Sequence, residues 1–187
     1  MDPQEVSSFV FGLRTSFAAL EGLPMPTIAA VEGAALGGGL ELAMACDLRV
    51  AGEKALLGLP ETALAIIPGA GGTQRLPRLV GAAKAKELVF TARRFGAEDA
   101  KDMGLVNRVA PAGEAYDSAL ELAREILPQG PVALRVAKVA ISQGVEMDKT
   151  SGMKLEEQCY AQVIPTKDRI EGLTAFREKR KPVYTGE

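Results

Sequence analysis

Residues 35–46, ALGGGLELAMAC, place three consecutive glycines directly before an apolar run that contains one carboxylate, Glu41. Burying an ionised group without partners is costly, so ordinary protein cores carry apolar side chains at such positions. Glu61 repeats the anomaly in ALLGLPETALAII, residues 55–67, where Thr62 is its only polar neighbour. Either glutamate alone can be a paired structural carboxylate. Two of them in such settings indicate a chemical role.

The glycines before the apolar run have two alternative explanations. They can form a tight turn in a crowded core, or they can let a ligand approach the backbone where a helix begins. The start of a helix exposes unpaired N–H groups, which favour an oxygen that acquires negative charge. A second glycine-rich loop, IIPGAGGTQRLP at residues 66–77, follows Glu61. The two glutamates and two loops predict a carboxylate pair that holds a water molecule beside an oxyanion site.

Composition excludes several classes of function. The chain has 187 residues, is 47% hydrophobic and 25% charged, and contains no histidine. These proportions are typical of a globular domain. The absence of histidine excludes Ser-His and Cys-His catalysis and the usual zinc ligand sets, so no metal site is predicted. A net charge of −2 gives no reason to expect nucleic acid or an anionic membrane as the main partner. Cys46 and Cys159 are expected to be reduced and buried.

Short apolar runs bounded by proline or glycine predict strands that alternate with short helices, and no strand is predicted after Ala110. This alternation is typical of an α/β fold, and the remaining sequence has helical periodicity. We therefore divide the chain into a core, residues 1–111, and a helical region, residues 112–187. The predicted strands are TIAAVEG at 27–33, LRVAG at 48–52, ALLGL at 55–59 and LVNRVA at 105–110.

Two helices carry clear end signals. DPQE predicts a helix start with Asp2 as the N-cap and Glu5 completing a capping box. PVALRVAKVAISQG predicts a helix that begins with Pro131 in its first turn and finishes at Gly144.

Two long motifs resemble the crotonase superfamily, the enoyl-CoA hydratases and isomerases. They are PTIAAVEGAALGGGLELAMACDLRVAG and GLPETALAIIPGAGGTQRLPRLVGAAKAKELVFTAR, and the likeness continues through AEDAKDMGLVNRV to IPTKDRIEGLTAFREKRKPVYTG. Within the superfamily, ETALAIIPGAGGTQRLPR and CYAQVIPTKDR are most similar to the mitochondrial enoyl-CoA hydratases that include methylglutaconyl-CoA hydratase.

The resemblance implies a spiral core of stacked ββα turns and a C-terminal helical region that builds trimers or hexamers. It also implies that the chain is shortened at its N-terminus. Family members have earlier strands and an AGAD stretch that supplies the second oxyanion N–H group. We therefore expect the 187-residue chain alone to hydrate crotonyl-CoA weakly or not at all.

The resemblance also implies roles for individual residues. Glu41 and Glu61 resemble the two glutamates that hold and activate water, and we assign the base to Glu41 and the acid to Glu61. The N–H group of Gly38 resembles one half of the oxyanion hole. Phe176 and Lys179, three residues apart on one helix face, resemble residues that reach the CoA of a neighbouring subunit, although a core phenylalanine with a solvated lysine is an equal alternative. The implied substrate-binding residues are Gly37, Leu59, Pro68 and Gly69.

The implied function is a mitochondrial enoyl-CoA hydratase of fatty-acid β-oxidation or leucine catabolism, acting on an acyl-CoA thioester without a further cofactor. One alternative is a catalytically silent subunit that assembles with full-length relatives. RNA binding is disfavoured because the lysine-rich segment associated with it in one relative is absent from this sequence. The acyl group stays open, and Arg75 or Arg78 is the candidate cation for a dicarboxylic one.

Overall fold

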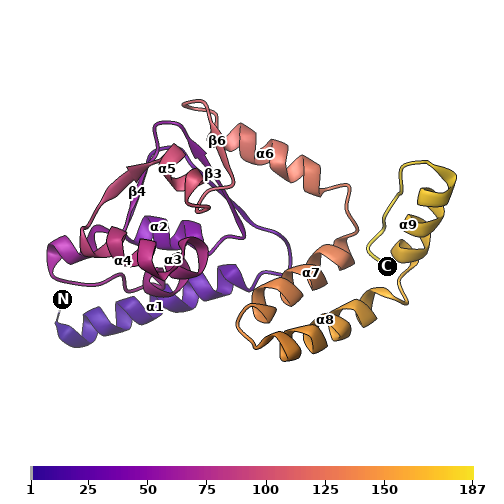
Figure 1. Ribbon diagram of the computed structural model, residues 1–187, viewed down its shortest axis with the longest axis horizontal. Coiled ribbons are helices and arrows are strands. Elements are labelled where there is room, and N and C mark those ends of the chain that lie inside the picture. The colour runs from indigo at the N-terminus through magenta and orange to yellow at the C-terminus, as the bar shows by residue number, and fades with distance from the viewer. Residues whose placement is uncertain (1) are drawn as a thin grey trace. The chain divides into compact units, whose positions relative to one another are not determined.

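The computed structural model describes residues 2–187, which form two compact units. The first contains the residues up to Leu23 together with Thr27–Glu121, and the second contains Pro24–Pro26 and Leu122–Glu187. Strands and helices alternate in the first unit, whereas the second is helical, as the predicted α/β class with a helix-rich C-terminal region requires (Figure 1). The domain division between residues 111 and 112 stays a prediction.

The strands of the first unit form two three-stranded sheets, with strand orders β1-β3-β6 and β2-β4-β5. All pairs are parallel except β4 with β5. Each predicted strand is present, but β2 and β5 were not predicted. The first sheet contains β1 (Ile28–Val31), β3 (Leu48–Gly52) and β6 (Arg108–Ala110), and the second contains β2 (Ala34–Leu36), β4 (Leu56–Gly58) and β5 (Arg94–Gly96).

Helices connect the strands of this unit. The first helix begins as predicted, because the Asp2 side chain accepts from the N–H groups of Gln4 and Glu5 and the Glu5 side chain accepts from the N–H group of Asp2. Figure 1 shows this helix along one side of the unit, next to α2 and α3. The helices are α1 (Pro3–Glu21), α2 (Gly38–Met44), the 3-10 helix η1 (Pro60–Leu64), α3 (Gly72–Val80), α4 (Ala82–Phe90), α5 (Ala97–Asp102) and α6 (Ala115–Ile126), whose last residues belong to the second unit.

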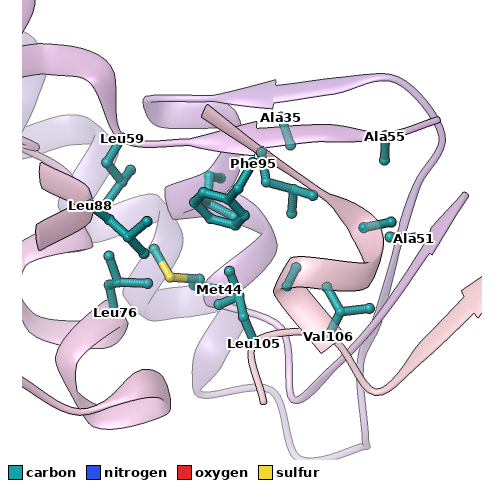
Figure 2. Packing of buried hydrophobic residues seen from close by; sticks show 14 of the residues in the cluster. Ala35, Met44, Ala51, Ala55, Leu59, Leu76, Leu88, Phe95, Leu105 and Val106 are labelled. Atoms are coloured by element: carbon teal, nitrogen blue, oxygen red, sulfur yellow. The ribbon is translucent and has the colours of Figure 1, made fainter. Parts of the chain in front are cut away.

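A hydrophobic core joins the strands to the helices α2, α3 and α4. In Figure 2, Leu59, Leu76 and Leu88 lie together on the helical side, and Ala51 and Ala55 lie on the strand side. A smaller cluster of Phe17, Ala45 and Ala70 packs α1 against the end of α2 and the loop before α3, and the two clusters together fix the elements that carry both glutamates.

The second unit contains α7 (Pro131–Gly144), α8 (Lys149–Val163) and α9 (Lys167–Glu178). The bounds of α7 are those predicted from its proline and glycine. The C-terminal segment is held to α9 because Asp168, which is buried, accepts from the N–H groups of Thr185 and Gly186.

Among the described residues, no helix is long and apolar enough to cross a membrane. Cys159 is buried as expected, whereas Cys46 is only half-buried, because it follows the C-terminal end of α2.

Candidate active site

The position of Glu41 is set by the turn between β2 and α2. At Gly37 the backbone has φ 56° and ψ −124°, a conformation that side chains disfavour. The Gly37 N–H group donates to the carbonyl oxygen of Gly58 at 2.9 Å, and the Gly37 carbonyl oxygen accepts from the N–H group of Glu41 at 3.0 Å. The chain therefore leaves the sheet and starts the helix at one residue, which places Glu41 in the first turn of α2, 3% exposed.

The carboxylate of Glu41 is bound by the backbone of a distant loop. Its Oε1 atom accepts from the N–H groups of Ala70 at 2.8 Å and Gly72 at 2.7 Å. Hydrogen bonds to a charged acceptor are stronger than neutral ones, so two of them offset much of the cost of burial. Both donors belong to the second glycine-rich loop.

The loop fits closely around this carboxylate. A Cβ atom placed on Gly72 would lie 2.9 Å from Oε1 of Glu41, 2.9 Å from Cδ1 of Leu59 and 2.8 Å from Cβ of Pro68. Real Cβ atoms do not approach their neighbours so closely. A glycine is therefore required at residue 72 for the loop to reach Glu41.

Glu61 lies in η1 and is half-buried. Its Oε2 atom is buried and has no hydrogen-bond partner among residues 2–187. Burial raises the pKa of Glu61 above its usual value of 4.5. A hydrogen bond with its own backbone lowers this pKa by a smaller amount, and the nearby carboxylate of Glu41 raises it by less still. The hydroxyl group of Thr62 donates to the carbonyl oxygen of Val89 at 2.6 Å, which fastens η1 to α4.

The structure thus brings both glutamates together from segments twenty residues apart. They lie close enough for the charge of one to act on the other. Gly37 leaves space for Glu61, whose Oε1 atom would lie 3.1 Å from a Cβ atom on that glycine. The pair combines a carboxylate fixed by backbone donors with one that is desolvated and holds its proton more readily, an arrangement suited to acid–base catalysis.

The other candidate residues of the first unit surround this pair. Gly38 is exposed at the start of α2, where a helix has no acceptor for its own N–H groups. Leu59 and Pro68 are buried against Gly72, and Gly69 is half-buried. Their roles stay predictions.

Phe176 and Lys179 belong to the second unit, at the C-terminal end of α9. Phe176 is 83% exposed, so it is not a core residue of this chain. Lys179 lies one residue beyond α9 in a left-handed conformation, with φ 55°. Its N–H group still donates to the carbonyl oxygens of Ala175 and Phe176, so the backbone between Phe176 and Lys179 is helical. Binding of a neighbouring subunit's CoA stays a prediction.

The two arginines suggested for a dicarboxylic acyl group are already engaged. Arg75 forms an ion pair with Glu21 at 2.7 Å and donates to the carbonyl oxygen of Ala70. Arg78 donates to the carbonyl oxygen of Gln74 within α3.

Sequence reasoning missed the donors that hold Glu41. Ala70 and Gly72 act through backbone N–H groups, and Arg14 of α1 donates to the carbonyl oxygen of Gly69 in the same loop. A backbone donor carries no side-chain signature. The cluster of glycines in PGAGG was the only available signal.

The fold matches that of solved protein structures. An enoyl-CoA hydratase from Bacillus anthracis has a TM-score of 0.97 and 54% identity, over 100% of this chain and 72% of that one. DspI of Pseudomonas aeruginosa has a TM-score of 0.95 and 38% identity, over 99% of this chain and 71% of that one.

The chain belongs to the enoyl-CoA hydratase/isomerase family, whose model matches residues 3–187. It is 58% identical over its full length to a probable mitochondrial enoyl-CoA hydratase 2 of Arabidopsis thaliana, of which it covers 62%. It is also 58% identical to the human mitochondrial methylglutaconyl-CoA hydratase, of which it covers 56%. The chain thus spans less than two thirds of these relatives. The resemblance to this family and its fold is confirmed.

Proposed function

We propose that the protein is an enoyl-CoA hydratase, which adds water across the C2=C3 double bond of a 2-enoyl-CoA thioester. The observation that carries this proposal is the pairing of Glu41 with Glu61, the first held by two backbone N–H groups and the second with a raised pKa. Hydration needs a base for the water and an acid for the carbon skeleton, and the pair supplies both.

Glu41 is the base in this proposal. The loop holds its Oε1 atom through Ala70 and Gly72, so the carboxylate keeps one orientation while its other oxygen, Oε2, takes a proton from water. The oxygen of that water then forms a bond to C3 of the thioester. The electrons of the double bond move towards the thioester carbonyl and create an enolate.

Glu61 is the acid. Its raised pKa favours the protonated form that can donate to C2 of the enolate, which completes the 3-hydroxyacyl-CoA product. The proton taken up by Glu41 returns through solvent to restore both groups. The protons balance over the cycle, because water loses one proton to Glu41 and C2 gains one proton from Glu61.

The thioester carbonyl needs a donor while it carries negative charge, and we assign the N–H group of Gly38 as one of the oxyanion donors. Gly37, Leu59, Pro68 and Gly69 are proposed to line the acyl site around the carboxylate pair. The reaction requires no cofactor, because coenzyme A is part of the substrate.

The names of the relatives support a narrower context. We propose a mitochondrial enzyme of fatty-acid β-oxidation or leucine catabolism, since relatives with 58% identity are a probable mitochondrial enoyl-CoA hydratase and a mitochondrial methylglutaconyl-CoA hydratase. We further propose a homotrimer or hexamer in which Phe176 and Lys179 contact the CoA of a neighbouring subunit. The exposure of Phe176 supports that assignment.

The test is hydration of crotonyl-CoA by the purified chain, followed through the loss of absorbance of the conjugated thioester. We expect Glu41→Gln and Glu61→Gln each to reduce the rate by about 100-fold or more, the usual contribution of a general acid or base. Glu98→Gln, the same change at an exposed position in the first turn of α5, is expected to leave the rate unchanged.

If both glutamate variants hydrate crotonyl-CoA at the rate of the unsubstituted chain, the proposal is overturned. The resemblance implies weak hydration or none by this chain, and absence of hydration by the unsubstituted chain would favour the silent-subunit alternative. Co-purification with a full-length relative then tests that alternative.

A further inference from the structure

One peptide group of the loop is bonded on both sides to charged side chains. The carbonyl oxygen of Gly69 accepts from Nε of Arg14 at 2.5 Å. The N–H group of Ala70, which belongs to the same peptide group, donates to Oε1 of Glu41 at 2.8 Å. A guanidinium cation and a buried carboxylate are therefore connected through a single amide.

The two hydrogen bonds reinforce each other. A cation at the carbonyl oxygen draws electron density through the amide and makes its N–H group a better donor, and a carboxylate at the N–H group makes the carbonyl oxygen a better acceptor. The same pair of bonds fixes the plane of the peptide group, because rotation of the amide would break both.

The second donor to Glu41 has a different origin. The N–H group of Gly72 belongs to the peptide whose carbonyl oxygen is that of Gly71, and this oxygen accepts from the backbone N–H groups of Gln74 and Arg75 in α3. Gly72 therefore provides an internal comparison for Ala70.

The position of Arg14 is set by the packing of α1. Phe17 of this helix is buried with Ala45 and Ala70. One turn before Arg14, Val10 lies against the loop, with Cγ1 3.2 Å from the position of a Cβ atom on Gly69. The helix therefore contacts the loop before Arg14, through Val10, and after it, through Phe17. These contacts hold the guanidinium next to the carbonyl oxygen of Gly69.

We propose that Arg14 is a positioning residue for Glu41, which it orients through the peptide group between Gly69 and Ala70. The catalytic consequence of this role rests on the proposed hydratase function, whereas the hydrogen-bonded connection does not. Arg75 does not play the same role as Arg14. It donates to the carbonyl oxygen of Ala70, which belongs to the next peptide group. The N–H group of that peptide is that of Gly71, whereas the donors to Glu41 are Ala70 and Gly72.

The connection is tested by NMR of the ¹⁵N-labelled chain and needs no activity. In Arg14→Gln we expect the amide proton of Ala70 to move upfield and to exchange with solvent about tenfold faster, since its hydrogen bond is weakened. The Gly72 amide should keep its shift and exchange rate. Arg14→Lys, which keeps a cation at this position, should restore part of the change at Ala70.

Arg93→Gln is the matched control, since it removes a positive charge from an exposed side chain of the same unit that pairs with Glu87 and Asp99. It should leave both amides unchanged. Equal changes at Ala70 and Gly72, or none at either, would overturn the proposal. If Arg14→Gln does not fold, the same comparison is made with Arg14→Lys alone, in which a smaller change confined to Ala70 is expected.

Turnover provides the second readout. We expect Arg14→Gln to lower kcat about tenfold with little change in KM, a typical loss for a residue that orients a catalytic group. The substitution should have no further effect in a Glu41→Gln background, because its influence passes through Glu41. If the chain has no hydratase activity, the changes at Ala70 alone decide the connection.

Discussion

Gly72→Ala adds one methyl group at the most confined point of the candidate site. The backbone of Gly72 tolerates any residue, so space alone opposes the substitution. The new Cβ atom would approach Oε1 of Glu41 and Cδ1 of Leu59 to 2.9 Å, about half an ångström inside the 3.4 Å where ordinary contact begins. Pro68 closes the third side at 2.8 Å. The loop or the carboxylate must therefore move.

Two costs follow from this movement. Overpacking of a well-filled core costs about 1 to 3 kcal/mol. Weakening a hydrogen bond to a charged group, here the bond from Gly72 to Glu41, costs about 1.5 to 3 kcal/mol. We expect the free energy of unfolding to fall by roughly 3 to 4 kcal/mol. Hydration should fall about 100-fold, because displacement of a catalytic group by about 1 Å has this effect.

The free energy of unfolding is measured by urea titration of both chains. Gly12→Ala is the matched control, because Gly12 lies inside α1 with open space around it. There the same methyl group should stabilise the protein by about 0.5 to 1 kcal/mol, since alanine favours a helix more than glycine. If Gly72→Ala were as stable as the unsubstituted chain, the close fit between the loop and Glu41 would be refuted.

Three further predictions concern stability. Because burial raises the pKa of Glu61 above 4.5, the folded chain holds this proton more tightly than the unfolded chain does, and its stability falls as pH rises from 4.5 through the raised value. The advantage of Glu61→Gln in urea titrations should therefore grow between about pH 4 and about pH 7, and an advantage independent of pH would contradict this. Arg49 is 4% exposed and donates to carbonyl oxygens including those of Leu105 and Cys46. Arg49→Met should therefore lower the free energy of unfolding by roughly 3 kcal/mol. A loss below about 1 kcal/mol would show that these oxygens find other donors. Thr62→Val keeps the side-chain shape but removes the donor to Val89, and thermal unfolding should show a loss of about 1 to 2 kcal/mol that Thr62→Ser restores.

Helix ends were predictable where side chains mark them. Asp2 and Glu5 bond to backbone N–H groups at the start of α1, and the interactions involved lie within a few residues of each other. The proline and glycine that bound α7 act through their own backbone preferences. Such signals are local, so the sequence alone contains them.

The short strands β2 and β5 were missed for the opposite reason. Each has three residues, too few for a periodic pattern, and β2 stands directly before the glycines at residues 37–39. Both strands exist because β4 bonds to them on either side. Pairing between backbones distant in sequence is a tertiary effect that no local pattern reports.

The residues of the candidate site also differ in whether a local sequence pattern or a tertiary contact reveals them. Glu41 and Glu61 were predictable because a carboxylate in an apolar stretch is anomalous in the sequence itself. Their partners were not predictable, because Ala70 and Gly72 donate through their backbones and Arg14 reaches the loop across 55 residues. Helix periodicity could place Arg14 on α1 but could not show which carbonyl oxygen it faces.

The difference between the two carboxylates explains why they are suited to different tasks. Glu41 lies on an α-helix, and two N–H groups of a loop that tolerates no added methyl group converge on one of its oxygens, which fixes the orientation of the carboxylate. Glu61 lies on a single 3-10 turn, and burial without a partner at Oε2 favours its protonated form. If the roles were exchanged, the base would have to be Glu61, the group whose burial favours the protonated form. The surroundings of the pair therefore support Glu41 as the base and Glu61 as the acid.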